Sequence, residues 1–217
     1  MRALQETELK QIGAAKVLFV MAAKAEYLTE LQKRFIPFIC NVGPVEAALH
    51  MSECLVINRD VDLVVSLGSA GSQKLQQAAV YQVSSVSYRD MDATPFGFPK
   101  GETPFLGLPA QVPIGLEIPN LPKASLSTGA NVVSGSAYND VSADMVDMET
   151  WAILRTCMHA NVPMVGLRGI SDGAEPVAEY SDWTRYLKVI DERLALAVDT
   201  LELALLEGRL KGFKKST

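Results

Sequence analysis

The 217-residue sequence has few cysteines and histidines, no excess of basic charge and no long hydrophobic run. Its three cysteines are odd in number and lack the spacing of metal ligands, which is typical of buried thiols in a reducing compartment. The formal net charge of −5 argues against a nucleic-acid partner, because phosphate backbones are bound through clustered Lys and Arg. A membrane-spanning helix needs a run of about 18 apolar residues, and the sequence contains none. We therefore expect a cytoplasmic protein without membrane or nucleic-acid partners.

The overall amino-acid composition indicates a globular domain. Apolar residues make up 48% and charged residues 21% of the chain, which is ordinary for a protein with a sizeable core. We expect one domain over residues 1–217, with an N-terminal extension at 1–15 and a polar tail at 209–217. The first eleven residues are too charged for a signal peptide.

Short apolar segments alternate with helical patterns along the chain. Strands are predicted at 17–22, 63–67, 79–88, 123–133 and 163–171. Helices are predicted at about 25–35, 43–57, 147–160 and 183–208, and a loop-rich, proline-punctuated region at 89–121. This alternation predicts a three-layer α/β/α fold, in which helices cover both faces of a mixed, twisted central sheet.

Polar residues follow several of the predicted strands. Glu26 follows the first strand, the sequence GSAGS at 68–72 follows the second, and Asp172 follows the last. Ligands of open α/β sheets bind at the carboxyl ends of strands, so these residues could share one cleft. Each also has a structural interpretation: Glu26 could complement a helix dipole, Asp172 could cap a turn, and GSAGS could be a plain turn. The residues alone leave both interpretations open.

Two charged residues occupy positions that are otherwise apolar. Glu149 lies on the small-residue stripe of the helix predicted at 147–160, so it either caps the helix start or binds the hydroxyls of a ligand. Arg168 lies inside an apolar strand and needs a carboxylate or a bound polar ligand, with a structural ion pair as plausible as a functional one. His50 and His159 have no nucleophile motif around them, so acid–base chemistry would have to come from carboxylates.

Six segments, found in the same order, resemble the nucleoside phosphorylase and nucleosidase superfamily, and within it the 5′-methylthioadenosine/S-adenosylhomocysteine nucleosidases. They span about residues 16–187 and read VLFVMAAKAEYLTEL, VVSLGSAGS, YRDMDATPFGFPKGETP, VVSGSAYND, VDMETWAIL and VPMVGLRGISDGAE. The resemblance implies a nucleoside phosphorylase-like α/β fold and hydrolysis of the N-glycosidic bond of an adenine nucleoside. It also implies a homodimer, with no metal or cofactor.

The same resemblance implies catalytic roles for five residues. Asp172 would be the general acid that protonates N7 of adenine, with Ser171 orienting its carboxyl group. Burial can keep such a carboxyl group protonated near neutral pH. Glu26 would bind and activate the attacking water, with Arg168 and Ser69 beside that water.

Substrate-binding roles are implied for five further residues. Glu149 would accept hydrogen bonds from the ribose hydroxyls, and Met148 would pack against the sugar. Tyr138 would stack on adenine, and the backbone at Asn139 would bind the edge of the base. Gly71, in the GSAGS sequence, is also expected to contact the substrate.

The choice of nucleophile can be argued from the residues around Gly68. Phosphorylases bind a phosphate dianion, usually with arginine side chains beside a glycine-rich loop. Here Ser66 and Leu67 precede Gly68, no arginine is near in sequence, and Glu26 would repel phosphate. Hydrolysis is therefore favoured. A purine nucleoside phosphorylase and a non-catalytic nucleoside-binding module remain the alternatives.

The sequence also departs from the family pattern. The segment 35–43 is markedly shorter than in relatives, and Trp151 stands where relatives carry small side chains, so the 5′ substituent of the substrate stays open. Phe96 and Phe98 lie in the loop that relatives contribute to the neighbouring subunit's site, and Trp183 could cover the pocket of its own chain. Plain packing is the alternative for all three aromatic residues.

Overall fold

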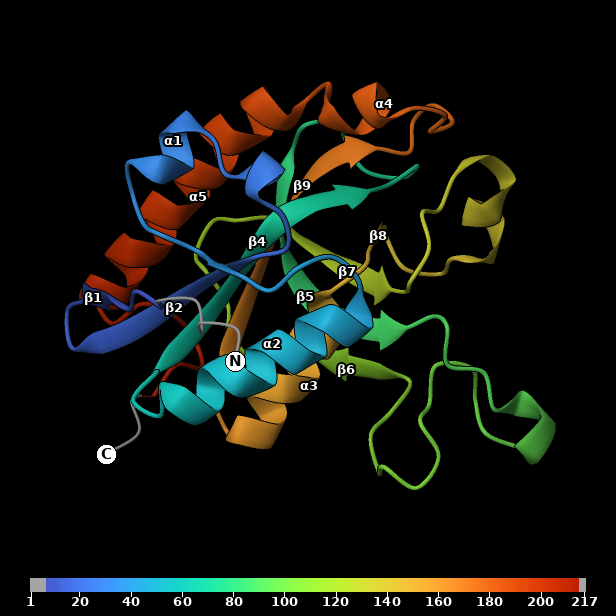
Figure 1. Ribbon diagram of the computed structural model, residues 1–217, viewed down its shortest axis with the longest axis horizontal. Coiled ribbons are helices and arrows are strands. Elements are labelled where there is room, and N and C mark those ends of the chain that lie inside the picture. The colour runs from blue at the N-terminus through green and yellow to red at the C-terminus, as the bar shows by residue number, and fades with distance from the viewer. Residues whose placement is uncertain (1–6, 215–217) are drawn as a thin grey trace, which may run out of the picture.

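The computed structural model describes residues 7–214, in which one mixed β-sheet lies between two layers of helices (Figure 1). The strands are β1 (Lys10–Ile12), β2 (Ala15–Met21), β3 (Phe38–Ile39), β4 (Leu63–Gly71), β5 (Val80–Tyr88), β6 (Gln111–Pro113), β7 (Lys123–Thr128), β8 (Met145–Asp147) and β9 (Met164–Asp172). Their order is β1-β2-β4-β8-β7-β5-β6, with β3 beside β2 and β9 paired to both β4 and β5. The predicted mixed sheet is confirmed, because β4 runs parallel to β2 and β9 while β5 runs antiparallel to β9.

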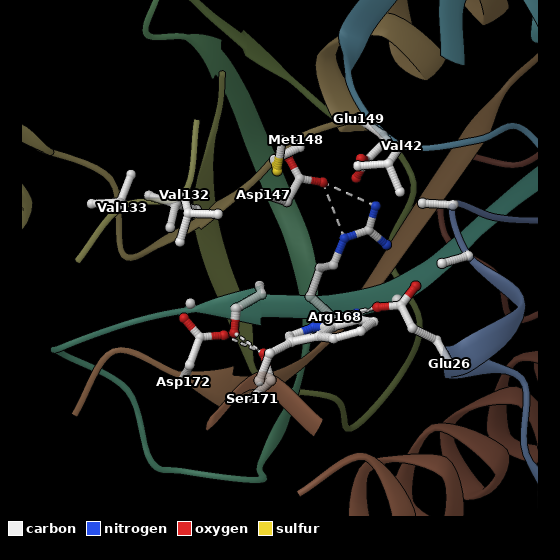
Figure 2. A pocket seen from close by; sticks show the side chains of 18 of the residues that line it. Glu26, Val42, Val132, Val133, Asp147, Met148, Glu149, Arg168, Ser171 and Asp172 are labelled. Carbon is white, nitrogen blue, oxygen red and sulfur yellow. Dashed lines mark hydrogen bonds and ion pairs between the residues drawn. The ribbon is translucent and has the colours of Figure 1, made fainter. Parts of the chain in front are cut away.

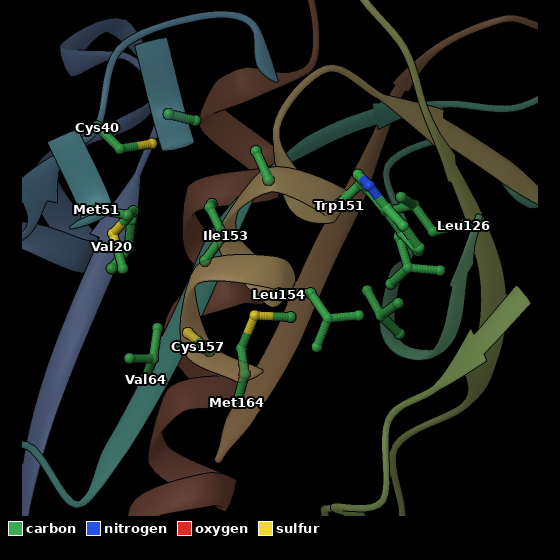
Figure 3. Close-up of a cluster of buried hydrophobic side chains, with 14 of the residues drawn as sticks. Val20, Cys40, Met51, Val64, Leu126, Trp151, Ile153, Leu154, Cys157 and Met164 are labelled. Carbon is green, nitrogen blue, oxygen red and sulfur yellow. The ribbon is translucent and has the colours of Figure 1, made fainter. Parts of the chain in front are cut away.

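Helices cover both faces of this sheet. The longer ones are α2 (Pro44–Ile57), α3 (Thr150–Ala160) and α5 (Leu187–Leu206), and the shorter ones are η1 (Lys24–Glu26), α1 (Thr29–Gln32), η2 (Thr94–Phe96), η3 (Gly135–Asp140) and α4 (Tyr180–Thr184). Helices α2 and α3 bury one hydrophobic cluster against the sheet, part of which Figure 3 shows, and α1 and α5 bury another on the opposite face. Successive residues of β2 alternate between the clusters, with Leu18 and Val20 in the first and Val17, Phe19 and Met21 in the second. The three-layer prediction is therefore confirmed.

Several predicted elements are wrong in their extent. The GSAGS sequence does not form a loop, because β4 continues through Gly71, where it pairs with β8 and β9. Pairing on both sides overrides the weak strand propensity of Gly and Ser. The predicted strand at 123–133 ends at Thr128, and the three-residue β8 is too short to show a periodicity in the sequence.

The helix predictions also need correction. The helix predicted at about 25–35 is two short pieces, η1 and α1. The backbone amides of Glu30 and Leu31 donate to the buried carboxylate of Asp191 on α5, at 2.8 and 3.2 Å, and this tertiary contact fixes where α1 begins. The helix predicted at 147–160 starts only at Thr150, and the one predicted at 183–208 is divided into α4 and α5.

Both ends of the described chain pack on the sheet or beside it. Strand β1, within the predicted extension, pairs with β2, and Leu210, within the predicted tail, is buried. Residues 1–6 and 215–217, on which part of these predictions falls, lie outside the described residues. No helix between residues 7 and 214 is long and apolar enough to cross a membrane. All three cysteines are buried free thiols, as predicted.

Strand β9 and helix α5 approach closely at Gly169. A Cβ atom at this position would lie 3.0 Å from Cγ1 and 3.2 Å from Cβ of Ile190. Carbon atoms do not pack that closely, so the glycine allows α5 to lie against the strand. The same strand carries Arg168, Ser171 and Asp172. This contact therefore helps to position the cavity described below.

We predict that Gly169→Ala lowers the free energy of unfolding by about 1–3 kcal/mol, because overpacking displaces the Ile190 side chain or the helix that carries it. Urea denaturation measures the change. Gly115→Ala is the matched control, since no atom lies within 4 Å of the Cβ that it would add. Equal destabilisation by the two substitutions would contradict this account of the helix–strand contact.

Candidate active site

The strand ends open into one cavity of about 620 Å³ (Figure 2). Eight of the ten site residues predicted from the sequence line it: Glu26, Ser69, Gly71, Met148, Glu149, Arg168, Ser171 and Asp172. They come from β4, β9, the turn after β2 and the connection between β8 and α3. Residues that are up to about 150 positions apart in the chain therefore share one site, as the rule for strand ends predicts.

Glu26 is held against the carboxyl-terminal half of β4. Its carboxylate is almost fully buried, and Oε1 accepts hydrogen bonds from the backbone amide of Ser69 at 2.7 Å and from the Ser69 hydroxyl at 2.6 Å. Burial raises the pKa of the Glu26 carboxyl, while the two hydrogen bonds from Ser69 and the charge of Arg168 act in the opposite direction. A Cβ at Gly68 would lie 3.2 Å from Oε2, so the small residue leaves room for this carboxylate.

Arg168 forms a buried ion pair with Asp147. Its Nε and Nη2 atoms each lie 3.2 Å from Oδ2 of Asp147, and Nη2 also donates to the Thr150 hydroxyl at 2.6 Å. The Nη1 atom donates to the carbonyl of Ser66 at 3.0 Å. Sequence analysis missed Asp147, although it lies two residues before Glu149 and a buried arginine required a carboxylate partner.

Glu149 occupies the N-cap position of α3 without capping it. Asp147 Oδ2 and the Thr128 hydroxyl accept hydrogen bonds from the first free amides of the helix. The Glu149 carboxyl group instead accepts a hydrogen bond from the backbone amide of Gly43 at 2.8 Å. Burial and the nearby charge of Asp147 raise the pKa of Glu149 to about 8. At neutral pH the group therefore holds a proton, so it can both donate to and accept from the hydroxyls of a diol.

Asp172 closes the carboxyl end of β9. Its Oδ1 atom accepts a hydrogen bond from the Ser171 hydroxyl at 2.5 Å. Burial raises the pKa of the Asp172 carboxyl, and the bond from Ser171 opposes this shift in part. A Cβ at Gly71 would lie 2.8 Å from Oδ2 of Asp172 and would collide with the Tyr138 hydroxyl. Only glycine at position 71 therefore leaves this carboxyl group in place.

Tyr138 and Asn139 do not line the main cavity, although the Tyr138 hydroxyl lies beside Gly71 and close to Asp172. They lie in η3 and line a second pocket of about 420 Å³, while Tyr138 buries a hydroxyl without a hydrogen-bond partner among the described residues. Val132 and Val133 line the main cavity, on the side of Asp172 (Figure 2). Sequence analysis missed both valines because it assigned them to a strand.

The segment after β9 supplies the remaining wall. Val177, Glu179, Tyr180 and Trp183 line the cavity, and Nε1 of Trp183 donates to the Ser69 hydroxyl at 2.8 Å. Trp183 therefore covers part of the pocket of its own chain, as the sequence suggested.

The other aromatic residues singled out in the sequence lie elsewhere. Phe96 and Phe98 do not line the cavity, and the Phe96 side chain is 83% exposed. Trp151 stacks on Tyr88 in the hydrophobic core, with 6.0 Å between the ring centroids. Neither His50 nor His159 lines the cavity. Residues 7–214 contain no cluster of three His, Cys, Asp or Glu side chains that could hold a metal ion.

The fold and the sequence both match proteins of one class. Residues 124–201 match the model of the phosphorylase superfamily. Over 201 residues the chain is 30% identical to the 5′-methylthioadenosine/S-adenosylhomocysteine nucleosidase of Staphylococcus aureus (strain MRSA252), and the match covers 81% of this chain and 82% of that one. The chain belongs to the 5′-methylthioadenosine/S-adenosylhomocysteine nucleosidase family of this superfamily.

Solved structures share the same fold. The nucleosidase of Colwellia psychrerythraea 34H, solved in complex with adenine, aligns with a TM-score of 0.71 at 23% identity, over 92% of this chain and 97% of that one. A futalosine hydrolase mutant of Helicobacter pylori strain 26695 aligns with a TM-score of 0.72 at 18% identity, and the alignment covers 85% of this chain and 97% of that one. These likenesses confirm the nucleoside phosphorylase-like fold.

We predict that Glu149 makes the stability of the free protein fall between pH 4.5 and about 8. Its pKa is raised from 4.5 to about 8 on folding, so the folded state binds the proton more tightly. The resulting stabilisation is fully present below pH 4.5 and is lost as the pH rises through about 8. Urea midpoints measured across this range should decline less steeply for Glu149→Gln than for the wild type. Parallel curves would show that Glu149 is not protonated at neutral pH.

Proposed function

We propose that the protein hydrolyses the N-glycosidic bond of an adenine nucleoside such as 5′-methylthioadenosine or S-adenosylhomocysteine, releasing adenine and the modified ribose. Membership of the nucleosidase family supports this function. The observation that carries it is the placement of Glu26, Glu149 and Asp172 in one cavity, each in a different environment. Carboxyl groups in different environments can divide acid and base roles between them.

Asp172 acts as the general acid. Burial raises the pKa of this carboxyl group and so favours the protonated form, which donates its proton to N7 of adenine as the bond between C1′ and N9 breaks. The bonding electrons pass to the base, which leaves as neutral adenine. The Ser171 hydroxyl keeps donating to Oδ1 and stabilises the carboxylate that forms.

Glu26 acts as the general base. Two hydrogen bonds from Ser69 hold Oε1, which leaves the other carboxylate oxygen, Oε2, for the nucleophile. The carboxylate takes a proton from water as the water oxygen bonds to C1′ of the ribosyl cation. Arg168, neutralised by Asp147, fixes the wall behind Glu26 and Glu149. Glu149 binds the ribose hydroxyls and Met148 packs on the sugar.

The base packs on the Asp172 side of the cavity. Val132 and Val133 line this side and supply an apolar surface and backbone groups for adenine. Tyr138 and Asn139, for which the family resemblance implied contact with the base, line the second pocket instead. We therefore assign the contacts with adenine to the two valines.

The charged groups of the cavity bear on the choice between water and phosphate as the nucleophile. Only Arg89 and Arg168 line it, and both are bound to groups of the protein itself. Arg168 pairs with Asp147, and the Nη atoms of Arg89 donate to the carbonyls of Ser127, Asp147 and Asn131. Among the described residues Arg89 forms no ion pair, and its Nε atom has no hydrogen-bond partner. The preference for water therefore rests on Glu26, because its carboxylate would repel a phosphate dianion in the same cavity.

The remaining features follow from the family resemblance. We propose a cytoplasmic protein with a single domain over residues 1–217, an extension at 1–15 and a tail at 209–217. We also propose a homodimer. The solvent-facing side of α2 supports it, because Val45 and Val56 there are 75% and 65% exposed.

Adenine release from 5′-methylthioadenosine, measured with and without added phosphate, tests the proposed reaction. Equal release under both conditions is expected of a nucleosidase. Release only with phosphate would assign the protein to the phosphorylases, and binding of adenine nucleosides without any release would indicate a binding module.

We predict that Asp172→Asn lowers kcat by about 10²–10⁴-fold, because the amide cannot donate a proton to the leaving base. Glu175→Gln, an exposed substitution three residues away, is the matched control and should keep the wild-type rate. Steady-state assays of adenine release compare the two. A rate for Asp172→Asn within tenfold of the wild type would exclude Asp172 as the general acid.

A further inference from the structure

A chain of hydrogen bonds leads from the helix that covers the cavity to the proposed general base. Nε1 of Trp183 donates to the Ser69 hydroxyl oxygen at 2.8 Å, and this hydroxyl donates to Oε1 of Glu26 at 2.6 Å. Trp183 lies in α4, more than a hundred residues from Ser69. We propose that Trp183 is a positioning residue, whose indole N–H orients the Ser69 hydroxyl toward Glu26. This inference rests on the proposed function of Glu26.

The chemistry of the indole determines which group donates in each of these hydrogen bonds. An indole N–H can only donate, so the Ser69 hydroxyl oxygen must accept from Trp183. The one hydroxyl proton of Ser69 is then directed at Glu26, where Oε1 also receives the Ser69 backbone amide at 2.7 Å. Both hydrogen bonds converge on the same oxygen of Glu26. The other oxygen, Oε2, is left to take the proton from water.

The helix that carries Trp183 is itself anchored. The side chains of Glu179 and Asp182 form a capping box at the start of α4. The Ser134 hydroxyl accepts a hydrogen bond from the amide of Val177 at 2.8 Å, which ties the segment to the loop after β7. The position of the segment 177–184 over the cavity therefore determines whether the indole reaches Ser69. The same placement of this segment would therefore both cover the substrate and orient the Ser69 hydroxyl toward Glu26.

Losing the indole N–H should raise the pKa of Glu26. Glu26 must be ionised to accept a proton, and the Ser69 hydroxyl bond favours the ionised form. Without the indole N–H the hydroxyl can rotate away from Glu26, and the pKa of Glu26 rises. The other charged and titratable groups that face Glu26 are Arg168, Asp147, Glu149 and the Cys40 thiol. None of them is altered by a change at Trp183.

The test is the pH profile of kcat/KM for adenine release by Trp183→Phe. Phenylalanine keeps an aromatic ring over the cavity but lacks the N–H. We expect the acid limb to move to higher pH by about 0.5–1 unit, as the weakening of one hydrogen bond to a carboxylate would cause. Thr184→Val removes a hydroxyl from the same helix at a position that does not line the cavity, and it should leave the acid limb at its wild-type position.

A double-substitution experiment tests the route through Ser69. Ser69→Ala removes the middle hydroxyl of the hydrogen-bond chain from Trp183 to Glu26. Adding Trp183→Phe to this variant should therefore move the acid limb no further. If Trp183→Phe lowered the rate equally at every pH, its role would be packing alone. A shift of the same size in the Ser69→Ala background would show that the effect does not pass through Ser69. Either result overturns the proposal.

The hydrogen-bond chain can also be measured without turnover. The protein contains two tryptophans, so in ¹⁵N-tryptophan-labelled protein the indole N–H signal of Trp183 is identified by its loss in Trp183→Phe. This signal should shift in Ser69→Ala and should titrate with Glu26, and Glu26→Gln should abolish the titration. If the Trp183 signal changes in neither Ser69→Ala nor Glu26→Gln, the positioning role is overturned. If the signal responds as expected but no adenine is released, the proposed function fails while the hydrogen-bond chain stands.

Discussion

Arg168 and Asp147 neutralise each other at the wall of the cavity, with their side chains only 3% and 2% exposed. Removing either partner would leave a buried charge, which costs about 3–5 kcal/mol in proteins. The pair also organises its surroundings, since Asp147 accepts from the first amide of α3 and Arg168 donates to Ser66 and Thr150. Two further carboxyl groups, Glu26 and Glu149, are buried nearby, where the charge of Arg168 lowers the pKa of each and the charge of Asp147 raises it. The ion pair between Arg168 and Asp147 thus leaves the cavity wall beside these carboxyl groups without net charge.

The three carboxyl groups around this pair differ in what surrounds them. Glu26 receives two hydrogen bonds at one oxygen, Asp172 receives one from its neighbour Ser171, and Glu149 receives one from a backbone amide close to the charge of Asp147. Burial raises the pKa of all three, and the number of compensating donors decides how far the ionised form recovers. Glu26, the proposed base, therefore receives more hydrogen bonds from the protein than Asp172 or Glu149.

The sequence predicted those features that depend on local order along the chain. Glu26 and Asp172 follow strands, and the strand-end rule together with the six family-like segments brought them to one cleft. Asp147 was missed because β8 has only three residues and shows no periodicity. The GSAGS sequence looked like a turn because its strand conformation comes from pairing with β8 and β9, which local propensity does not encode. The sequence order could not show that Tyr138, in the short helix η3, lines a neighbouring pocket while its hydroxyl lies beside Gly71.

The segment 35–43 contributes two groups to the cavity. It forms the two-residue strand β3 beside β2 and then enters α2 at Gly43. Gly43 has a φ of 93°, a conformation that residues with a Cβ rarely adopt, although no atom would obstruct a side chain there. The glycine is therefore needed for the direction of its backbone, which aims the amide at Glu149. This connection thus supplies the hydrogen bond to the Glu149 carboxyl group, and it places Val42 in the cavity wall.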